Sequence, residues 1–397
     1  MLPKVILLGS LYLAQGLPYG FFTQALPVLL REHGLSLPLI GLANLLALPW
    51  ALKFVWAPLI DDVRAPRVGR RRAVIIPVQL LSVAVLGSLA FAASPDAVWA
   101  LCVAVLLVNL LAATQDIATD ALAVEILGPQ ERGLGNGLQV GAYRTGMIIG
   151  GGAMLLVFAY AGWVAAFVGL AVILLAATVP VLMFREPPPV VEMPRQKMTL
   201  GVILAIIRES MSRPGMAPWL LVLTTYKVGE WFASGMLRTF LTDAKLGIED
   251  IALMLGLVGF SAAVIGALAG GALTTKLGQS RALVVFGALQ TLAIASLAVA
   301  AQAPSIPMFY AVIVAEHVTS AMATAALFTA MMDRCRDTHA GTDYTVQASL
   351  VVVTTGIIAG LSGVSAHALG YTGHFIAAAG LSAFGVAMAA RVGRLEP

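Results

Sequence analysis

Charged residues and cysteines are both scarce in this sequence, and each shortage excludes a class of protein. Charged residues make up 11% of the 397 residues, whereas hydrophobic residues make up 59%. The mean hydropathy is +0.92. Since soluble domains carry about 25% charged residues, this composition excludes a soluble globular protein. Only two cysteines are present, Cys102 in an apolar stretch and Cys335 in a polar one, so we expect no disulfide and no metal-binding cluster.

The motifs of common enzyme sites are also missing. The sequence contains no phosphate-binding loop, no nucleophile elbow and no set of metal ligands at a recognised spacing. We therefore expect no enzyme activity, no cofactor and no metal. Because there is no ATP-binding segment either, any uphill movement of a solute would have to draw on an ion gradient.

Long apolar stretches, in contrast, fill most of the sequence. A helix needs about 20 mostly apolar residues to cross the hydrocarbon of a membrane. Helix is the expected conformation because lipid offers no hydrogen-bond partner to the backbone. Twelve stretches have about this length: residues 5–30, 38–60, 73–93, 97–122, 134–159, 163–184, 217–242, 250–275, 282–302, 306–331, 345–366 and 374–392. The sequence thus predicts an all-α membrane protein with twelve transmembrane helices. The first stretch is too long for a signal-peptide core, so we expect it to stay as the first helix.

The basic residues predict how these helices are oriented. The loops on one side of the membrane carry only Arg31 and Lys245, and four basic residues fall inside the predicted spans: Lys53, Arg144, Lys227 and Arg238. The remaining eighteen of the 24 lysines and arginines fall in the loops on the other side. Because cytoplasmic loops are enriched in lysine and arginine, we expect that side, and both termini, to be cytoplasmic.

The longest polar interruption divides the chain into two halves. It covers residues 185–216, begins with Arg185-Glu-Pro-Pro-Pro, and contains an expected amphipathic helix at residues 198–211 that could lie on the inner membrane surface. We therefore predict one six-helix half at residues 1–184 and another at 217–397. Both halves have an inner turn that combines glycine with basic residues, at 69–72 and 270–281. Two related six-helix halves are the architecture of major facilitator transporters, whose substrate site lies between the halves.

Glycines recur every four residues along the fifth predicted span. Gly133, Gly137 and Gly141 form the first series, and Gly146 and Gly150 repeat the interval. Glycine at this spacing makes a smooth helix face that another helix can approach closely. The face could serve static packing or sliding, and both suit a transporter.

Ionisable residues inside the predicted spans are candidates for function, because burying them in a membrane is costly. In spans four and five, Asp116 and Asp120 share a helix face, and Arg144 is expected near the level of Asp116, so the two could pair. Lys53 in span two could join them. The group is either a set of static buried pairs or a network that holds the inner ends of helices together in one state and releases them in another.

The loop after the second span is the most densely charged part of the chain. Residues 61–72 contain five arginines and two aspartates. Its arginines predict topology, and its acids extend the charged group described above. We define the predicted cytoplasmic gate as the residues expected to hold the inner helix ends together: Lys53, Asp61, Arg70, Arg71, Asp116, Asp120, Arg132 and Arg144.

Two further sets of ionisable residues lie in the second half. Lys227 and Glu230 are three residues apart, so they either neutralise each other or face a central cavity, where one of them would bind a charged solute or carry a proton. Glu316 lies near mid-span, and no nearby basic residue of its helix is expected to pair with it. His317 beside it is equally well explained as a packed neutral ring. A carboxyl group at mid-membrane could take up a proton near neutrality, so Glu316 and then Glu230 are the proton-coupling candidates.

Polar and aromatic residues in span one are candidates for contact with a solute. Tyr12, Gln15 and Tyr19 follow one another at helical intervals of three and four residues. This stripe either lines a cavity or packs against a neighbouring helix. With the polar part of span seven, the substrate-cavity candidates are Tyr12, Gln15, Tyr19, Tyr226, Lys227 and Trp231.

Several runs occur in order through the N-terminal half, and together they resemble the AmpG-type permease branch of the major facilitators. They are Gln15-Gly-Leu-Pro18, Lys53-Phe-Val-Trp-Ala-Pro-Leu-Ile-Asp61, Gly69-Arg-Arg71, Gln115-Asp-Ile117 with Asp120-Ala121, Glu131-Arg-Gly133 and Tyr143-Arg-Thr-Gly146. The branch includes bacterial anhydromuropeptide permeases, acetyl-coenzyme A transporters of eukaryotic endomembranes, and bacterial inner-membrane importers of siderophores such as pyochelin and rhizobactin.

The resemblance implies a secondary transporter of the bacterial inner membrane that imports a medium-sized amphipathic solute, driven by protons. Residues 13–20 and 341–347 look more like the siderophore importers, so the expected cargo is a siderophore or its iron complex, with an anhydromuropeptide as the alternative. A non-transporting membrane sensor or assembly partner is the alternative from another class. The expected partners are the solute, the lipid bilayer and protons, without nucleic acid, and we expect a monomer.

Overall fold

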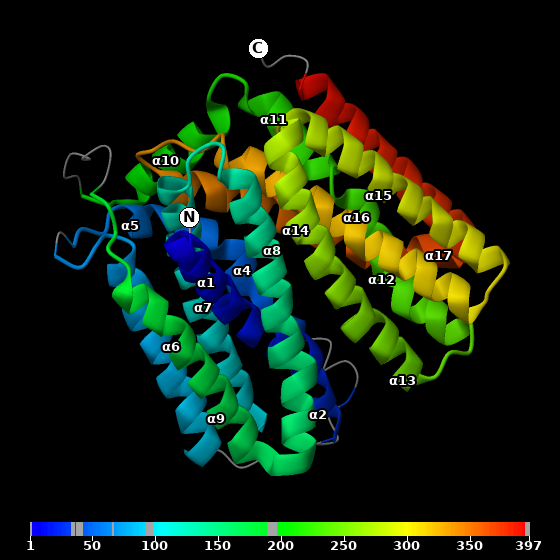
Figure 1. The fold of residues 1–397 in the computed structure, drawn as a ribbon, viewed down its shortest axis with the longest axis horizontal. Coiled ribbons are helices and arrows are strands. Elements are labelled where there is room, and N and C mark those ends of the chain that lie inside the picture. The colour runs from blue at the N-terminus through cyan, green and yellow to red at the C-terminus, as the bar shows by residue number, and fades with distance from the viewer. Residues whose placement is uncertain are drawn as a thin grey trace. The chain divides into compact units, whose positions relative to one another are not determined.

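The computed structural model describes residues 2–32, 36, 43–65, 67–92, 98–188 and 197–393, and every regular element in these ranges is helical (Figure 1). The elements up to residue 183 are α1 Leu2–Gly20, η1 Phe21–Ala25, α2 Leu26–Glu32, η2 Ala43–Ala47, α4 Leu48–Leu52, η3 Lys53–Val55, α5 Ala57–Asp61, α6 Arg72–Ala92, α7 Val98–Ile126, α8 Arg132–Ile148, η4 Ile149–Ala153 and α9 Met154–Met183. Those that follow are α10 Leu200–Ser212, α11 Met216–Thr225, α12 Val228–Asp243, α13 Ile248–Ile251, η5 Ala252–Gly259, α14 Phe260–Leu277, α15 Gln279–Gln302, α16 Ile306–Met332 and α17 Ala340–Gly393.

Eight helices in the described ranges are long and apolar enough to cross a membrane. Two of them, Arg132–Met183 and Ala340–Gly393, have 52 and 54 residues, about twice the length that one crossing needs. Each is interrupted by a glycine with a positive φ, Gly162 at 79° and Gly370 at 67°. Glycine adopts this conformation readily because it has no Cβ. Each long element is therefore a pair of helices joined at a glycine with almost no loop.

Two predicted spans are not continuous helices. In the second, predicted at 38–60, residues 38–42 lie outside the described ranges and the rest forms the short pieces η2, α4, η3 and α5. Pro49 and Pro58 begin two of these pieces, since proline cannot donate the hydrogen bond that a helix interior needs. The seventh, predicted at 217–242, breaks at Tyr226–Lys227 between α11 and α12.

The polar linker contains a helix near the predicted place. Helix α10 covers Leu200–Ser212, where the sequence predicts one at 198–211. Residues 189–196 of the linker, with the predicted inner-side Arg195, lie outside the described ranges, and so does Arg394 near the C-terminus. That α10 lies on a membrane surface stays a prediction.

The chain forms two compact units. The first consists of Met1–Leu127, Ala142–Ile207 and Cys335–Thr345, and the second of Gly128–Gly141, Arg208–Arg334 and Val346–Pro397. Each unit thus contains a short piece of chain that is distant in sequence from its other parts. The division into halves at residues 184 and 217 follows sequence order and stays a prediction.

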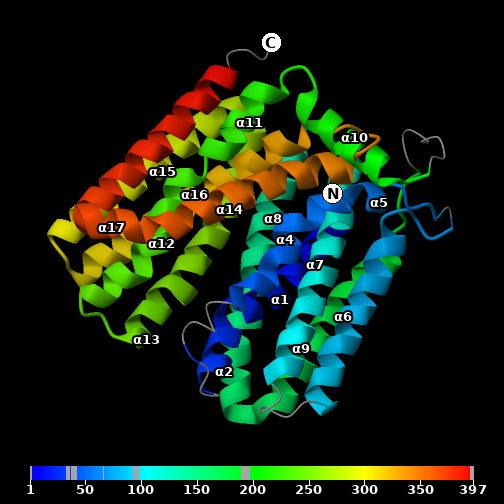
Figure 2. The same ribbon diagram turned by 180° about the vertical axis from the view of Figure 1, so that it is seen from behind.

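Each unit has its own apolar core. In the first, α1, α6, α7 and α9 pack around Phe21, Leu86, Val105 and Phe167, and Figures 1 and 2 both show α6 beside α9. In the second, α14 and α15 pack on α16, and the core there includes Ile294, Leu297, Ile313 and Phe375.

The glycine series along α8 and η4 allows the close helix contacts that its spacing predicts. Within the second unit, a Cβ on Gly133 or Gly137 would collide with the backbone of α14 near Gly271. Within the first unit, a Cβ on Gly146 or Gly150 would collide with the backbone of α1. Close backbone approach of this kind is what small residues permit at membrane helix interfaces.

Candidate functional site

A buried ion pair lies in the first unit, between the break in the second predicted span and α7. The Lys53 ammonium pairs with the Asp116 carboxylate, and both residues are buried, at 4% and 7% exposed. One helical turn further along α7, Asp120 accepts a hydrogen bond of 2.9 Å from the Tyr12 hydroxyl. Charges buried this deeply need partners, so Lys53 fixes the position of Asp116 and Tyr12 fixes that of Asp120.

Gln15 lies near the same pair. Helix α1 runs antiparallel to α7, since Tyr12 contacts Asp120 whereas Leu17 shares a small cavity with Val105. Gln15 is one turn after Tyr12, and Asp116 is one turn before Asp120, so Gln15 lies at the level of Asp116.

Two glutamine amides in this region have polar atoms without a partner. Three buried side-chain atoms make no hydrogen bond to the described residues: Gln15 Oε1, Gln15 Nε2 and Gln115 Nε2. A buried polar atom left unpaired costs about 1–3 kcal/mol. These amides are therefore available to hydrogen-bond a ligand.

Three aromatic rings follow one another beside Lys53, and the nearest is that of Trp50. The ring centroid of Tyr19 lies 5.8 Å from that of Trp50 and 5.8 Å from that of Tyr143. Lys53 Nζ is 5.7 Å from the centroid of Trp50, within reach of a cation–π interaction. The first unit thus combines a charge pair, free amides and aromatic faces, and we call Tyr12, Gln15, Tyr19, Trp50, Lys53, Gln115, Asp116 and Tyr143 the unit-1 polar site.

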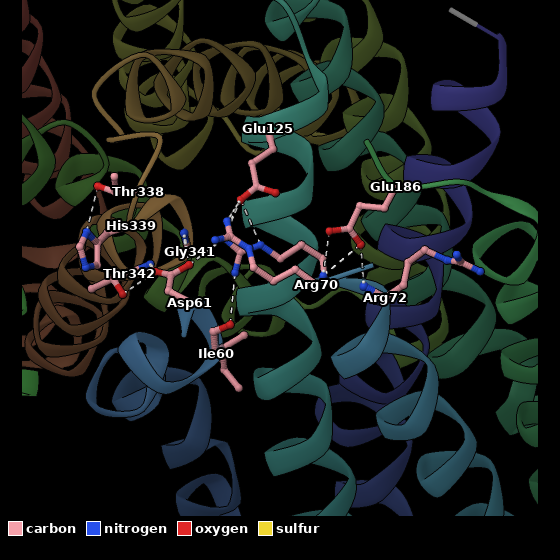
Figure 3. A network of polar contacts seen from close by, with 11 residues as sticks. Ile60, Asp61, Arg70, Arg72, Glu125, Glu186, Thr338, His339, Gly341 and Thr342 are labelled. Carbon is pink, nitrogen blue, oxygen red and sulfur yellow. Dashed lines mark hydrogen bonds and ion pairs between the residues drawn. The ribbon is translucent and has the colours of Figure 1, made fainter. Parts of the chain in front are cut away.

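A second network lies where the loop before α6 meets the end of α7 (Figure 3). The fully buried Arg71 guanidinium is 2.8 Å from Asp61 and 2.6 Å from Glu125, and Arg70 also bonds Glu125 at 2.5 Å. Burial opposes the charge of Arg71, but Asp61 and Glu125 outweigh it and raise the pKa of Arg71 above its usual value. Glu186 accepts the backbone N–H groups of Arg71 and Arg72, each at 3.0 Å, and so caps the start of α6.

Asp61 also binds the first turn of α17. Its carboxylate accepts hydrogen bonds from the backbone N–H of Gly341 at 3.2 Å and of Thr342 at 2.7 Å, and from the Thr342 hydroxyl at 2.7 Å (Figure 3). The N-terminus of a helix carries partial positive charge and unpaired N–H groups, and a carboxylate there satisfies both. Arg336 holds the preceding turn through two bonds to Asp343, at 2.8 and 2.9 Å. Asp61 therefore joins the Arg71 network to the start of α17.

The second unit contains a third buried polar group. Lys227, at the break between α11 and α12, pairs with Glu230. The Ser320 hydroxyl and the Gln290 amide also donate to Glu230, at 2.6 and 2.5 Å. Tyr226 donates its hydroxyl to the Leu283 carbonyl at 2.7 Å. Glu230 is thus held by three donors, whereas Trp231 is 42% exposed.

Glu316 has a partner in its own helix, contrary to the sequence-based expectation. His317 Nδ1 is 2.8 Å from Glu316 Oε2 and 3.0 Å from the Ile313 carbonyl. Neighbouring residues on a helix usually point apart, which is why the expectation failed; here the long Glu316 side chain lies against the ring. Glu316 is buried at 4% exposed and His317 is half-buried, so the two groups form a carboxylate–imidazole pair.

The structure places the predicted gate residues in separate groups. Lys53 lies with Asp116, and Asp61 with Arg70 and Arg71. Arg132 bonds Asp333 at 2.5 Å within the second unit. The predicted pairing of Asp116 with Arg144 stays a prediction.

Sequence reasoning missed several members of these groups: Trp50, Glu125, Glu186, Gln290, Ser320 and Asp333. Glu125 had a usable signal, since it follows Asp116 and Asp120 on the same helix, but the predicted span ended at 122. The others lie next to their partners only in the folded chain.

Comparisons with known proteins point to one family. The family described as the Major Facilitator Superfamily matches residues 8–354. An uncharacterized protein of Haemophilus influenzae is 30% identical over 371 residues, covering 91% of this chain and 87% of that protein. The anhydromuropeptide permease of Escherichia coli K12 is 26% identical over 378 residues, covering 94% of this chain and 76% of the permease. Among solved structures, the human organic anion transporter MFSD10 superposes with a TM-score of 0.76 at 16% identity, covering 98% of this chain and 99% of that one.

Proposed function

Because the chain belongs to the Major Facilitator Superfamily, and within it to the AmpG-type permease branch, we propose that this multi-pass membrane transporter imports anhydromuropeptides across a bacterial inner membrane. The E. coli relative named for this cargo aligns along nearly the whole chain. This supports an anhydromuropeptide over the siderophore that residues 13–20 and 341–347 favour. The E. coli relative is a permease and the structurally similar MFSD10 is a transporter, which supports a role without catalysis.

The unit-1 polar site is the main structural observation that supports an anhydromuropeptide as the cargo. An anhydromuropeptide joins sugar rings with acetamido groups to a short peptide with carboxylates. The rings of Tyr19, Trp50 and Tyr143 offer flat apolar faces for the sugars. The amides of Gln15 and Gln115 have free hydrogen-bonding atoms for acetamido groups and hydroxyls. Lys53 supplies a cation for a carboxylate.

The helix lengths support twelve spans. The 52- and 54-residue elements each provide two crossings, so the eight long helices provide ten crossings in all. The broken segments η2–α5 and α11–α12 provide two more. An even number of spans places both termini on one side of the membrane, and the basic loops make that side cytoplasmic.

The contact between Asp61 and α17 supports a gate on the cytoplasmic side. Transport by this fold requires parts of the protein to rock around a central site. A carboxylate that satisfies both Arg71 and the start of α17 stabilises one arrangement only. We propose that the bonds from Asp61 to Gly341 and Thr342 form and break in each cycle, while the bonds from Arg71 to Glu125 persist.

Uptake into proteoliposomes tests the cargo. We expect the purified protein to accumulate radiolabelled anhydromuropeptide when the lumen is alkaline and the outside is acidic, and to ignore a ferric siderophore. Liposomes without protein are the control. Uptake of the siderophore alone would reverse the assignment of cargo, and uptake of neither would favour the sensor or assembly role.

Replacing Glu316 with glutamine is expected to abolish accumulation against a gradient while leaving exchange of labelled for unlabelled solute intact. A carboxyl group can hold and release a proton, whereas an amide cannot. Glu230→Gln is expected to act in the same direction. Both measurements use the same proteoliposomes.

The control is Glu249→Gln, which removes an exposed carboxylate in the first turn of α13. It should accumulate solute like the wild type. Normal accumulation by both the Glu316 and the Glu230 variant would contradict proton coupling through these residues.

A further inference from the structure

A basic hollow of about 970 Å³ lies on the first unit, outside the unit-1 polar site, and the predicted gate residues Asp61 and Arg70 line part of it. It is formed by the loop from α5 to α6 and by residues 182–188 at the end of α9. Five arginines line it against three carboxylates: Arg64, Arg67, Arg70, Arg72 and Arg185 against Asp61, Asp62 and Glu186. The hollow therefore has an excess of positive charge.

The carboxylates of the hollow are already bound by other groups. Asp61 is held by Arg71 and the start of α17. Glu186 is held by two backbone N–H groups at the start of α6. Asp62 lies 3.9 Å from Arg64. None of the three is free to neutralise a further cation.

Two of the five arginines in the hollow make no hydrogen bond or ion pair to the described residues. Arg70 is bound to Glu125, and Arg72 donates to the carbonyl oxygens of Val181 and Leu182, both at 2.8 Å. Arg67 and Arg185 are exposed, and neither has a hydrogen bond or ion pair among the described residues. Two free guanidinium groups in one hollow suit a compact anion, above all a phosphate, which arginine binds with paired N–H groups.

The hollow is lined by the ends of two candidate membrane spans. One candidate membrane span begins at Arg72 and another ends at Met183, and both residues line the hollow. Figures 1 and 2 show the end of α9 beside the start of α6. Leu182 and Met183 at its edge are 53% and 78% exposed. A ligand here would meet cations on one side and exposed apolar side chains on the other, which is the chemistry of a lipid at the headgroup level.

We propose that the hollow binds the phosphate of an anionic phospholipid, with Arg67 and Arg185 as its ligands and Leu182 and Met183 against its acyl chains. The site is independent of the cargo, because none of its residues belongs to the unit-1 polar site. A free phosphate shares the headgroup's charge but has no acyl chain to contact the apolar edge.

Native mass spectrometry of the detergent-solubilised full-length protein tests this proposal. The probes are phosphatidylglycerol, phosphatidylcholine and inorganic phosphate. We expect the wild type to retain one phosphatidylglycerol in preference to phosphatidylcholine. The double variant Arg67→Gln/Arg185→Gln should bind phosphatidylglycerol about 30-fold more weakly, since each arginine near an anionic lipid contributes about a factor of five.

The matched control is Lys276→Gln/Arg281→Gln, which removes the same charge from exposed residues outside the hollow. It should bind phosphatidylglycerol like the wild type. Equal loss in the two double variants, or no loss in the first, would overturn the site. Displacement of phosphatidylglycerol by an equal concentration of inorganic phosphate would show that the hollow takes free phosphate and would overturn the lipid assignment.

Discussion

Replacing Lys53 with methionine is expected to abolish import and to lower the free energy of unfolding by about 3–5 kcal/mol, because it leaves the Asp116 carboxylate buried without its cation. Methionine keeps the length and apolar stem of lysine, so the change removes charge and little volume. The measurements are anhydromuropeptide uptake in proteoliposomes and thermal unfolding of the purified protein.

The double variant Lys53→Met/Asp116→Leu separates the two roles of this pair. Replacing a buried ion pair by apolar residues of similar volume is often neutral for stability. We therefore expect the double variant to unfold near the wild-type temperature but still to fail in import, because the cation for the cargo's carboxylate is gone. Wild-type import by the double variant would reduce the pair to a structural element. Lys276→Met, at an exposed position, is the control for loss of a lysine.

Replacing Asp61 with alanine is expected to have the second largest effect. The change leaves Arg71, which is fully buried, with Glu125 as its remaining carboxylate in this network, and it removes the acceptor from the N–H groups of Gly341 and Thr342. We expect a loss of about 3–5 kcal/mol in the free energy of unfolding and a loss of import.

The adjacent Asp62 provides the matched control. Its contact with the exposed Arg64 is 3.9 Å long, and surface pairs of this kind contribute about 0–1 kcal/mol. Asp62→Ala should therefore keep both stability and import. If Asp61→Ala and Asp62→Ala behave alike in thermal unfolding, the network around Arg71 does not stabilise the start of α17 as its geometry indicates.

The sequence correctly predicts that the regular elements of the described residues are helical, because lipid offers the backbone no hydrogen-bond partner. Where a helix is enclosed by protein instead of lipid, the sequence predicts the ends of that helix less accurately. The fourth span was predicted to end at residue 122, yet α7 continues to Ile126. Its last turns are surrounded by protein, with Ala121, Leu122 and Ala123 fully buried, so the charged Glu125 can extend the helix by pairing with Arg71.

The candidate site was harder to predict because its members meet over long stretches of chain. Asp61 and Thr342 are separated by 281 positions, and Glu230 and Ser320 by 90. The cost of burying a charge indicates that Asp61 and Glu230 need partners, but it does not identify Thr342 or Ser320 as those partners. Lys53 with Asp116 and Lys227 with Glu230 are two buried pairs inside the predicted spans whose members the sequence analysis places in the same group.

The breaks within helices have a similar explanation. Hydropathy averages over a whole stretch and is insensitive to a single residue with non-helical dihedrals. In the second span, Pro49 and Pro58 are local signals that the helix is interrupted. The seventh span breaks after Tyr226 without a proline or glycine at Lys227, where the buried pair with Glu230 occupies the gap.

The division of the chain into units has a mechanical consequence. Three of the boundaries, after Gly141, Ile207 and Thr345, fall inside the helices α8, α10 and α17 and not in loops. A hydrogen-bonded helix transmits bending and twisting along its axis, whereas a loop dissipates them. Any displacement of one unit would therefore bend or twist these three helices, and the elastic energy stored in them would be released when the displacement reverses.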